Sequence, residues 1–175
     1  YRWCEWKGRW YKDKGDEFAK LVDLPRRVGA RLEIATEIHA LQDELRAFSG
    51  AGWTLADGLA VSRSLECYEA YLGGSSAEFS AAKGGYVLSQ CGWFSDRSVC
   101  YLASGRPVVL QDTGIGRSLP VGRGLHLFSD VEGAVTACRG VVERFPEEQR
   151  AARALAETHF ASDVVIERML ARLSL

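Results

Sequence analysis

Short apolar segments alternate with helical patterns along almost the whole chain, and this alternation constrains the fold more than any other feature. Residues 31–38, 106–112 and 125–129 are dominated by apolar and β-branched side chains, as buried strands are. Strands that alternate with helices form a mostly parallel sheet with helices on both faces. We therefore expect an α/β fold, in which ligands bind beyond the carboxyl ends of the strands.

The segments between these strands carry apolar residues at helical spacing, with glycine or proline near their ends. The helices expected on this basis cover residues 16–22, 41–53, 65–73, 95–104, 130–145, 146–160 and 162–173. The last three would form a helical C-terminal segment. Residues 54–61 are expected to be extended, and residues 76–90 to hold a short strand and a glycine turn.

Single residues mark several of the expected helix ends. Leu24 and Pro25 should end the first helix, because proline cannot continue one. Ser129 and Ser162 stand where N-caps belong, and Pro146 suits a first helical turn.

Length and charge limit the classes of function. The chain has 175 residues, which suits one domain with a full hydrophobic core, and its net charge is -1. This balance gives no basic field that would recruit nucleic acid. There is no signal-peptide pattern, and no apolar run approaches the ~20 residues of a membrane span. Five cysteines without a CxxC pair favour reduced thiols, and so a cytoplasmic protein.

The start of the sequence is unusual. Met169 is the only methionine, and the chain opens at Tyr1, so we expect a fragment of a longer protein. The opening residues combine Trp3, Trp6 and Trp10 with both basic and acidic residues. The acidic residues argue against a base-stacking surface, and we expect these aromatics to pack on a sheet or on a missing partner domain.

The segment "QCGWFSDRS", residues 90–98, has the composition of a phosphate-binding turn. A helix is expected to start at Ser95 or Asp96, where unpaired backbone N–H groups and the helix dipole favour an anion. Gly92 would let a ligand approach the backbone, and Lys83 or Arg97 could neutralise its charge. The alternative is that Ser95 and Asp96 merely cap a helix. Neither GxGxxG nor GxxxxGK[ST] is present.

A longer stretch, "QCGWFSDRSVCYLASGRPVVLQDTG", resembles the nucleotide-sugar signature of glycosyltransferases with the GT-B architecture. One branch of these enzymes has His-Cys-Gly-Trp-Asn-Ser, a helix, Ala-x-Gly-x-Pro and a strand. The chain is also similar over nearly its whole length to bacterial group 1 glycosyltransferases, through "KGDEFAKLVDLP", "AEFSAAKGGYV" and "LPVGRGLHLFSDVEGAV".

The resemblance implies that residues 1–175 form one Rossmann-like domain, the C-terminal half of a GT-B enzyme. This domain would bind a nucleotide diphosphate sugar, with a UDP-sugar as a candidate, and would need neither a metal nor another cofactor. The acceptor, which is unknown, would bind to a missing N-terminal domain. The implied donor-binding residues are Lys83, Gln90, Gly92, Trp93, Phe94, Ser95, Asp96, Arg97, Asp112, Thr113 and Gly114.

Two residues depart from the family pattern. Gln90 replaces the histidine of the signature and cannot carry a charge. Cys100 stands where retaining members have a glutamate that binds ribose, so the ribose contact and the stereochemical course stay open.

Several alternatives accompany this interpretation. Trp93 and Phe94 could stack on a nucleobase or be buried against the sheet. Asp112 could be a general base, a hydroxyl acceptor or a turn residue. His39, His126 and His159 lack metal-ligand spacing, and His126 could have a minor role near the sugar. A non-catalytic scaffold module derived from a glycosyltransferase domain is the alternative function. A response-regulator-like or nicotinamide-binding domain would need an acidic cluster or a glycine fingerprint that the sequence lacks.

Overall fold

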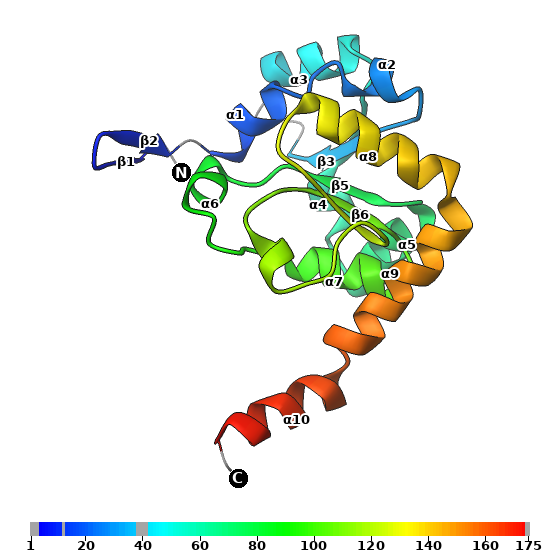
Figure 1. Ribbon diagram of the computed structural model, residues 1–175. Helices are drawn as coiled ribbons and strands as arrows, with labels where there is room; N and C mark the ends of the chain where they lie inside the picture. The colour runs from blue at the N-terminus through cyan, green and yellow to red at the C-terminus, as the bar shows by residue number, and fades with distance from the viewer. Residues whose placement is uncertain (1–3, 12, 38–41, 174–175) are drawn as a thin grey trace.

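The computed structural model describes residues 4–11, 13–37 and 42–173, and helices and strands alternate along it (Figure 1). The strands are β1 Cys4–Trp6, β2 Arg9–Tyr11, β3 Glu33–Thr36, β4 Thr54–Asp57, β5 Glu78–Ser80, β6 Val108–Gln111 and β7 Leu125–Phe128. The helices are α1 Lys14–Ala19, α2 Leu24–Val28, α3 Gln42–Gly50, α4 Gly58–Val61, α5 Leu65–Gly74, α6 Gly84–Ser89, α7 Asp96–Ala103, α8 Val131–Glu143, α9 Phe145–His159 and α10 Ser162–Leu173, with a 3-10 turn, η1, at Ile115–Arg117.

The strands of the body form two parallel sheets. One has the order β5-β6-β7, and the other pairs β3 with β4. In the larger sheet Val109 of β6 lies between Phe79 of β5 and His126 of β7. The predicted α/β fold with parallel strands is confirmed, although β3 and β5 do not pair and the expected single sheet is divided between them.

Helices cover both faces of the larger sheet (Figure 1). On one face α8 packs against β6, β7 and α2, and on the other α7 packs against β6 and α9. Each face has its own apolar cluster, because alternate residues of a strand point to opposite sides. Phe79, Val109 and Phe128 belong to the first cluster, and Val108 and Leu125 to the second. Burial of these side chains contributes about 1.5–3 kcal/mol each.

Several helix ends lie where the sequence predicts them. Pro146 is in the first turn of α9, and Ser95 occupies the N-cap position of α7, although its side chain makes no capping hydrogen bond. Asp130, and not Ser129, caps α8, because its carboxylate accepts a hydrogen bond of 2.7 Å from the Gly133 N–H. Ser162 is the first residue of α10 and not the residue before it.

Three short helices correct the sequence predictions. Pro25 does not end a helix but lies in the first turn of α2, where its missing N–H is of no consequence. The expected extended segment 54–61 becomes helical at Gly58, after Asp57 accepts a hydrogen bond from the Leu59 N–H. Residues 84–89 form α6 and not a turn. Helices this short show no periodicity, so a sequence pattern does not reveal them.

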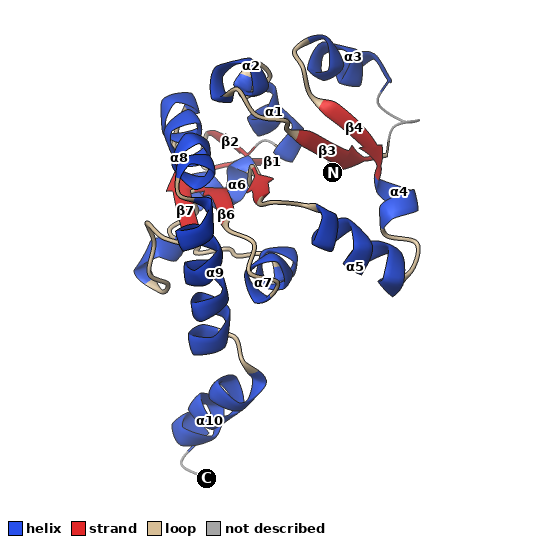
Figure 2. Ribbon diagram, turned by 90° about the vertical axis from the view of Figure 1, so that its right-hand side faces the viewer, coloured by secondary structure: helices blue, strands red, loops and turns tan. Residues whose placement is uncertain are grey.

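The two ends of the described chain extend away from the body. β1 and β2 form an antiparallel hairpin, with Lys7 and Gly8 at positive φ in its turn. Trp10 is exposed, whereas Tyr11 lies against Gly85 of α6. At the other end α10 projects beyond α9 (Figure 2), and its Ile166, Met169, Leu170 and Leu173 are exposed.

Candidate functional site

The structure brings together the two segments that the sequence analysis assigned to the donor site. The Gly92 N–H donates to the Thr113 carbonyl at 2.7 Å, and the Thr113 hydroxyl donates to the Trp93 carbonyl at 2.7 Å. The Gln90 amide donates to the Asp112 carbonyl at 3.3 Å. Residues 90–95 are therefore fastened to residues 112–114 at the carboxyl end of β6. We call these two segments the loop bridge.

Most polar groups of the loop bridge are satisfied within it. Asp112 acts as a turn residue, since its carboxylate accepts from the Gly114 N–H at 2.7 Å. Thr113 is buried, and the guanidinium of Arg117 donates to the Gln90 carbonyl. Gly114 has φ +88°, and a Cβ there would lie 2.9 Å from the Gln90 carbonyl oxygen. These contacts give Gln90, Asp112, Thr113 and Gly114 a structural role, and donor contacts from them stay a prediction.

The two aromatic residues of the loop bridge point in different directions. Phe94 stacks on Phe160 with ring centroids 5.6 Å apart, and it packs against the apolar cluster between α7 and α9. Trp93 is 37% exposed and stacks on Tyr86 at 5.1 Å. Phe94 is therefore half-buried against this cluster, and its contact with a nucleobase stays a prediction. Trp93 keeps an accessible edge beside the loop.

The start of α7 offers backbone donors next to this loop. Ser95 is the N-cap, and Asp96 is the first helical residue. Gly92 has φ +75°, and a Cβ built there would have no atom within 4 Å. Positive φ favours glycine, and the open space beside it would let a ligand reach the backbone. The helix start and the open glycine are the features that phosphate binding requires.

Arg97 turns away from the loop bridge and toward β5. Its Nε donates to Glu78 Oε1 at 2.7 Å, and its Nη2 donates to Ser80 Oγ at 3.1 Å. Lys14, the first residue of α1, donates from Nζ to the same Ser80 oxygen at 2.9 Å. We call Lys14, Glu78, Ser80 and Arg97 the switch-point cluster.

Lys14 is the most perturbed cation of this cluster. Burial, with help from the positive charge of Arg97, lowers the pKa of Lys14 to about 8. The carboxylate of Glu78 acts in the opposite direction, and Lys83 adds to the lowering. Lys83 is the N-cap residue of α6, with Nζ 5.8 Å from the centre of the Tyr86 ring. The charges of Arg97 and Lys83 therefore both act on Lys14, which contacts Ser80 at the end of β5, and this concentration of positive charge favours an anion.

The cluster borders a cavity of about 1160 Å³ between the facing edges of β3 and β5. Residues 30–36 line one side and residues 74–80 the other, and Lys14 and Arg97 lie on the wall. The cavity lies between two sheets whose strand orders lead away from it. On one side β3 is followed by β4, and on the other β5 is followed by β6 and β7. In open parallel sheets such a reversal of strand order is where ligands bind.

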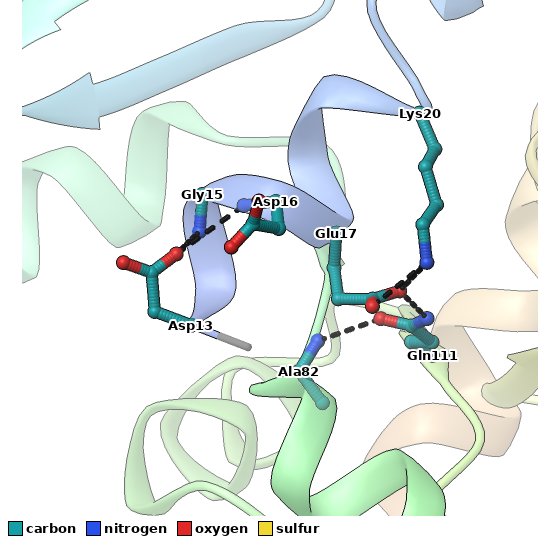
Figure 3. A network of polar contacts seen from close by, with 7 residues as sticks. All are labelled: Asp13, Gly15, Asp16, Glu17, Lys20, Ala82 and Gln111. Carbon is teal, nitrogen blue, oxygen red and sulfur yellow. Dashed lines mark hydrogen bonds and ion pairs between the residues drawn. The ribbon is translucent and has the colours of Figure 1, made fainter. Parts of the chain in front are cut away.

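A hydrogen-bond network holds α1 over the ends of the strands (Figure 3). Gln111, the last residue of β6, donates to Glu17 Oε2 at 2.7 Å and accepts from the Ala82 N–H at 3.1 Å. Lys20 pairs with the same Glu17 at 2.8 Å. Asp13 caps α1 by accepting from Gly15 and Asp16. This network fixes the position of Lys14 at the start of the helix.

The histidines do not join this site. His126 Nε2 lies 2.7 Å from Glu148 Oε2, which also accepts from the Gly124 N–H, so the pair ties β7 to α9. The Gly124 N–H, His126 and Arg144 together lower the pKa of Glu148 against the effect of burial. His159 ends α9, and His39 lies outside the described residues. Within residues 4–11, 13–37 and 42–173, no group of three His, Cys, Asp or Glu could hold a metal ion.

Sequence reasoning missed Lys14, Glu78 and Ser80. Glu78 offered a signal, because a charged residue at the start of a buried strand needs a partner. No sequence signal identifies Lys14, because its contact with Ser80 joins residues 66 positions apart.

Comparisons of the chain with protein-family models, with curated proteins and with solved structures find no match. In the described part of the chain, no helix is both long and apolar enough to cross a membrane.

Proposed function

We propose that the chain binds a nucleotide diphosphate sugar and is the donor half of a glycosyltransferase with the GT-B architecture. The observation that carries the proposal is the presence of two phosphate-favouring features beside the neighbouring strands β5 and β6. The start of α7 with the open Gly92 is one, and the cations Lys14, Lys83 and Arg97 are the other. The resemblance of residues 90–114 to the nucleotide-sugar signature of these enzymes points to the same ligand.

In this proposal the domain acts on the leaving diphosphate. Negative charge develops on the diphosphate as the glycosidic bond to the sugar breaks. Backbone N–H groups at the start of α7, the helix dipole and the three cations would stabilise that charge. These groups are held in place before the reaction by the loop bridge and the network around Gln111, so little reorganisation is needed. The scheme uses no metal ion.

The acceptor and any general base belong to a second domain in this scheme. The GT-B architecture that the sequence resembles places the acceptor opposite the donor domain. The described residues alone should therefore bind the donor with little or no turnover. The free thiols of Cys67, Cys91, Cys100 and Cys138 suit the cytoplasmic location that we propose with this function.

A non-catalytic module is the second candidate, and one observation favours it. Six of the expected donor residues bond to one another in the loop bridge, and Cys100 stands at the position where retaining members of the family that the sequence resembles bind ribose. A domain that has lost its donor could keep these contacts for stability alone. Its exposed Trp10 could then contact a protein partner.

Calorimetric titration with UDP, GDP, ADP and TDP, followed by the matching nucleotide sugars, tests the proposal. Saturable binding of one diphosphate, tighter than that of inorganic phosphate, is the expected result. Absence of binding to every diphosphate and every nucleotide sugar, for the chain and for a longer protein that contains it, would leave the scaffold module as the better interpretation.

A further inference from the structure

Glu78 carries a buried oxygen that the protein does not satisfy. The residue is 4% exposed, and its Oε1 accepts from Arg97 at 2.7 Å. Its Oε2 has no hydrogen-bond partner among the residues that the structure describes. An unsatisfied buried acceptor destabilises the fold, more so when it is charged, so folded proteins rarely keep one without a function. Glu78 lines the cavity between β3 and β5, where a ligand could supply the missing donor.

The surroundings of Glu78 determine what kind of donor fits. Arg97 and Lys14 already contribute two positive charges close to this carboxylate. A cationic group of a ligand would be repelled by them, whereas a neutral hydroxyl would not. The unsatisfied oxygen therefore favours a ligand hydroxyl.

Lys14 indicates the second part of the ligand. One of its N–H groups donates to Ser80, and no carboxylate in the described part of the chain lies within ion-pair distance of its Nζ. The cluster of Lys14, Arg97 and Glu78 thus has an excess of one positive charge, from two cations and one carboxylate. An anionic group beside Lys14 would balance this charge and offset the cost of burying the ammonium.

The cavity has the size and lining of a ligand site. Its volume of about 1160 Å³ is close to the upper end of the range for small-molecule pockets. Phe18, Ile34 and Phe79 supply apolar walls, and the polar lining consists of the switch-point cluster together with residues that include Asp13, Asp16, Arg31 and Glu33. Polar groups that converge beside apolar walls are typical of a specific site.

We infer that the cavity between β3 and β5 binds the hydroxyl-bearing sugar phosphate portion of the ligand, with Glu78 Oε2 accepting from a hydroxyl and Lys14 contacting the phosphate. The identity of the complete ligand rests on the proposed function. Glu78 then determines specificity, because the site would bind a phosphate ester with free hydroxyl groups more tightly than one without them. Ser80 and Arg97 orient Lys14 and Glu78, respectively, through the hydrogen bonds described above.

Ribose 5-phosphate, methyl phosphate and UDP are the probes, each titrated into the chain and followed by calorimetry. The wild type should bind ribose 5-phosphate about 10-fold more tightly than methyl phosphate, because only the first probe can donate to the charged Glu78. Equal affinities for these two probes in the wild type would overturn the inference without any variant being needed.

Two variants sharpen the test. Glu78→Gln keeps the shape but can present an N–H where the oxygen was, so ribose 5-phosphate should bind about 10-fold more weakly and methyl phosphate should be unaffected or bind more tightly. Lys14→Met should weaken both probes. Glu132→Gln and Arg150→Met are controls at exposed positions, and should bind both probes as the wild type does. Thermal melts establish that each variant is folded.

The outcomes separate this inference from the proposed function. Binding of UDP together with equal affinity for ribose 5-phosphate and methyl phosphate would overturn the sugar phosphate site and leave the donor function standing. The expected probe and variant pattern without binding of any nucleotide diphosphate would support the site and remove the donor function. Unchanged binding of ribose 5-phosphate by folded Glu78→Gln would also overturn the site.

Discussion

The loop bridge lies at the carboxyl end of β6 and the switch-point cluster lies along the neighbouring strand β5, and the polar groups of the two regions differ in how they are satisfied. In the loop bridge, the carbonyls of Trp93, Asp112 and Thr113 all receive hydrogen bonds from its own residues. In the switch-point cluster, Glu78 keeps one buried oxygen without a partner and Lys14 has a lowered pKa. The hydrogen bonds of the loop bridge thus stabilise the fold, whereas the switch-point cluster has polar groups that a ligand could bind. Apart from Gly92, which lies beside the open start of α7, substitutions in the first should therefore change stability, and those in the second should change binding.

The largest expected effect is on stability and comes from Gly114→Ala in the loop bridge. The new side chain has to adopt φ +88° and would lie 2.9 Å from the Gln90 carbonyl oxygen, with the Arg117 guanidinium also in its way. We expect a loss of about 2–5 kcal/mol in the free energy of unfolding, measured by urea denaturation.

Gly92→Ala is the matched control for Gly114→Ala. It has the same need for positive φ but open space around the new Cβ, so about 1–2 kcal/mol should be lost. If the two variants were equally stable, close packing in the loop bridge would not explain its rigidity. Gly92→Ala should weaken diphosphate binding beyond its modest effect on stability, because the methyl group occupies the space beside the backbone.

The next effect concerns affinity and the cations. Lys83→Ala and Arg97→Ala should each weaken diphosphate binding by about 1–3 kcal/mol in calorimetry, because each removes a charge near the phosphate. Lys83→Ala is the cleaner variant, since Arg97→Ala also leaves Glu78 without its ion-pair partner. Arg150→Ala, which removes an exposed cation that pairs with Glu147, is the control. Unchanged affinity in both folded variants would exclude Lys83 and Arg97 from the site.

A smaller effect is expected from Thr113→Val, which keeps the shape but removes the hydroxyl that bonds to the Trp93 carbonyl. The loss should be about 1–2 kcal/mol in the free energy of unfolding. Thr136→Val, at an exposed position of α8, should stay within about 0.5 kcal/mol of the wild type. A stable Thr113→Val variant would show that this hydrogen bond does not fasten the two segments together.

The last effect concerns the pH dependence of stability. The pKa of Lys14 is about 8 in the folded chain against 10.5 as its reference value, so the unfolded state binds more protons between these two pH values. The contribution of Lys14 therefore makes the folded state more stable as the pH rises from about 8 to 10.5. Urea denaturation of the wild type and of Lys14→Met across this range should differ by that rise. Parallel curves would contradict the lowered pKa.

The sequence predicts the fold well where the pattern is long or strongly apolar. The strand at 108–111 and the helices α8 and α9 follow directly from buried, periodic residues. The hairpin at residues 4–11 and the helices α4 and α6 escape prediction because they are too short to show a period. The break between β3 and β5 is a tertiary feature, and no local pattern encodes it.

The candidate site is predicted only in part for the same reason. The approach of residues 90–95 to residues 112–114 follows from their places after neighbouring strand segments. The sequence indicates Arg97 as a charge near phosphate, but its partner Glu78 is known only from the structure. Lys14 comes from the first helix, and the network around Gln111 that positions it joins residues 94 positions apart. Such long-range contacts depend on the complete fold.

The pKa of Lys14, measured by NMR on its side-chain resonances with and without UDP, tests the central claim most directly. The assignment follows from the resonance that is lost in Lys14→Met. We predict a pKa of about 8 without ligand and a clear rise when UDP binds, because a phosphate beside the ammonium stabilises its charged form. Saturation with UDP that leaves the pKa of Lys14 unchanged would contradict the account and place the diphosphate away from the switch-point cluster.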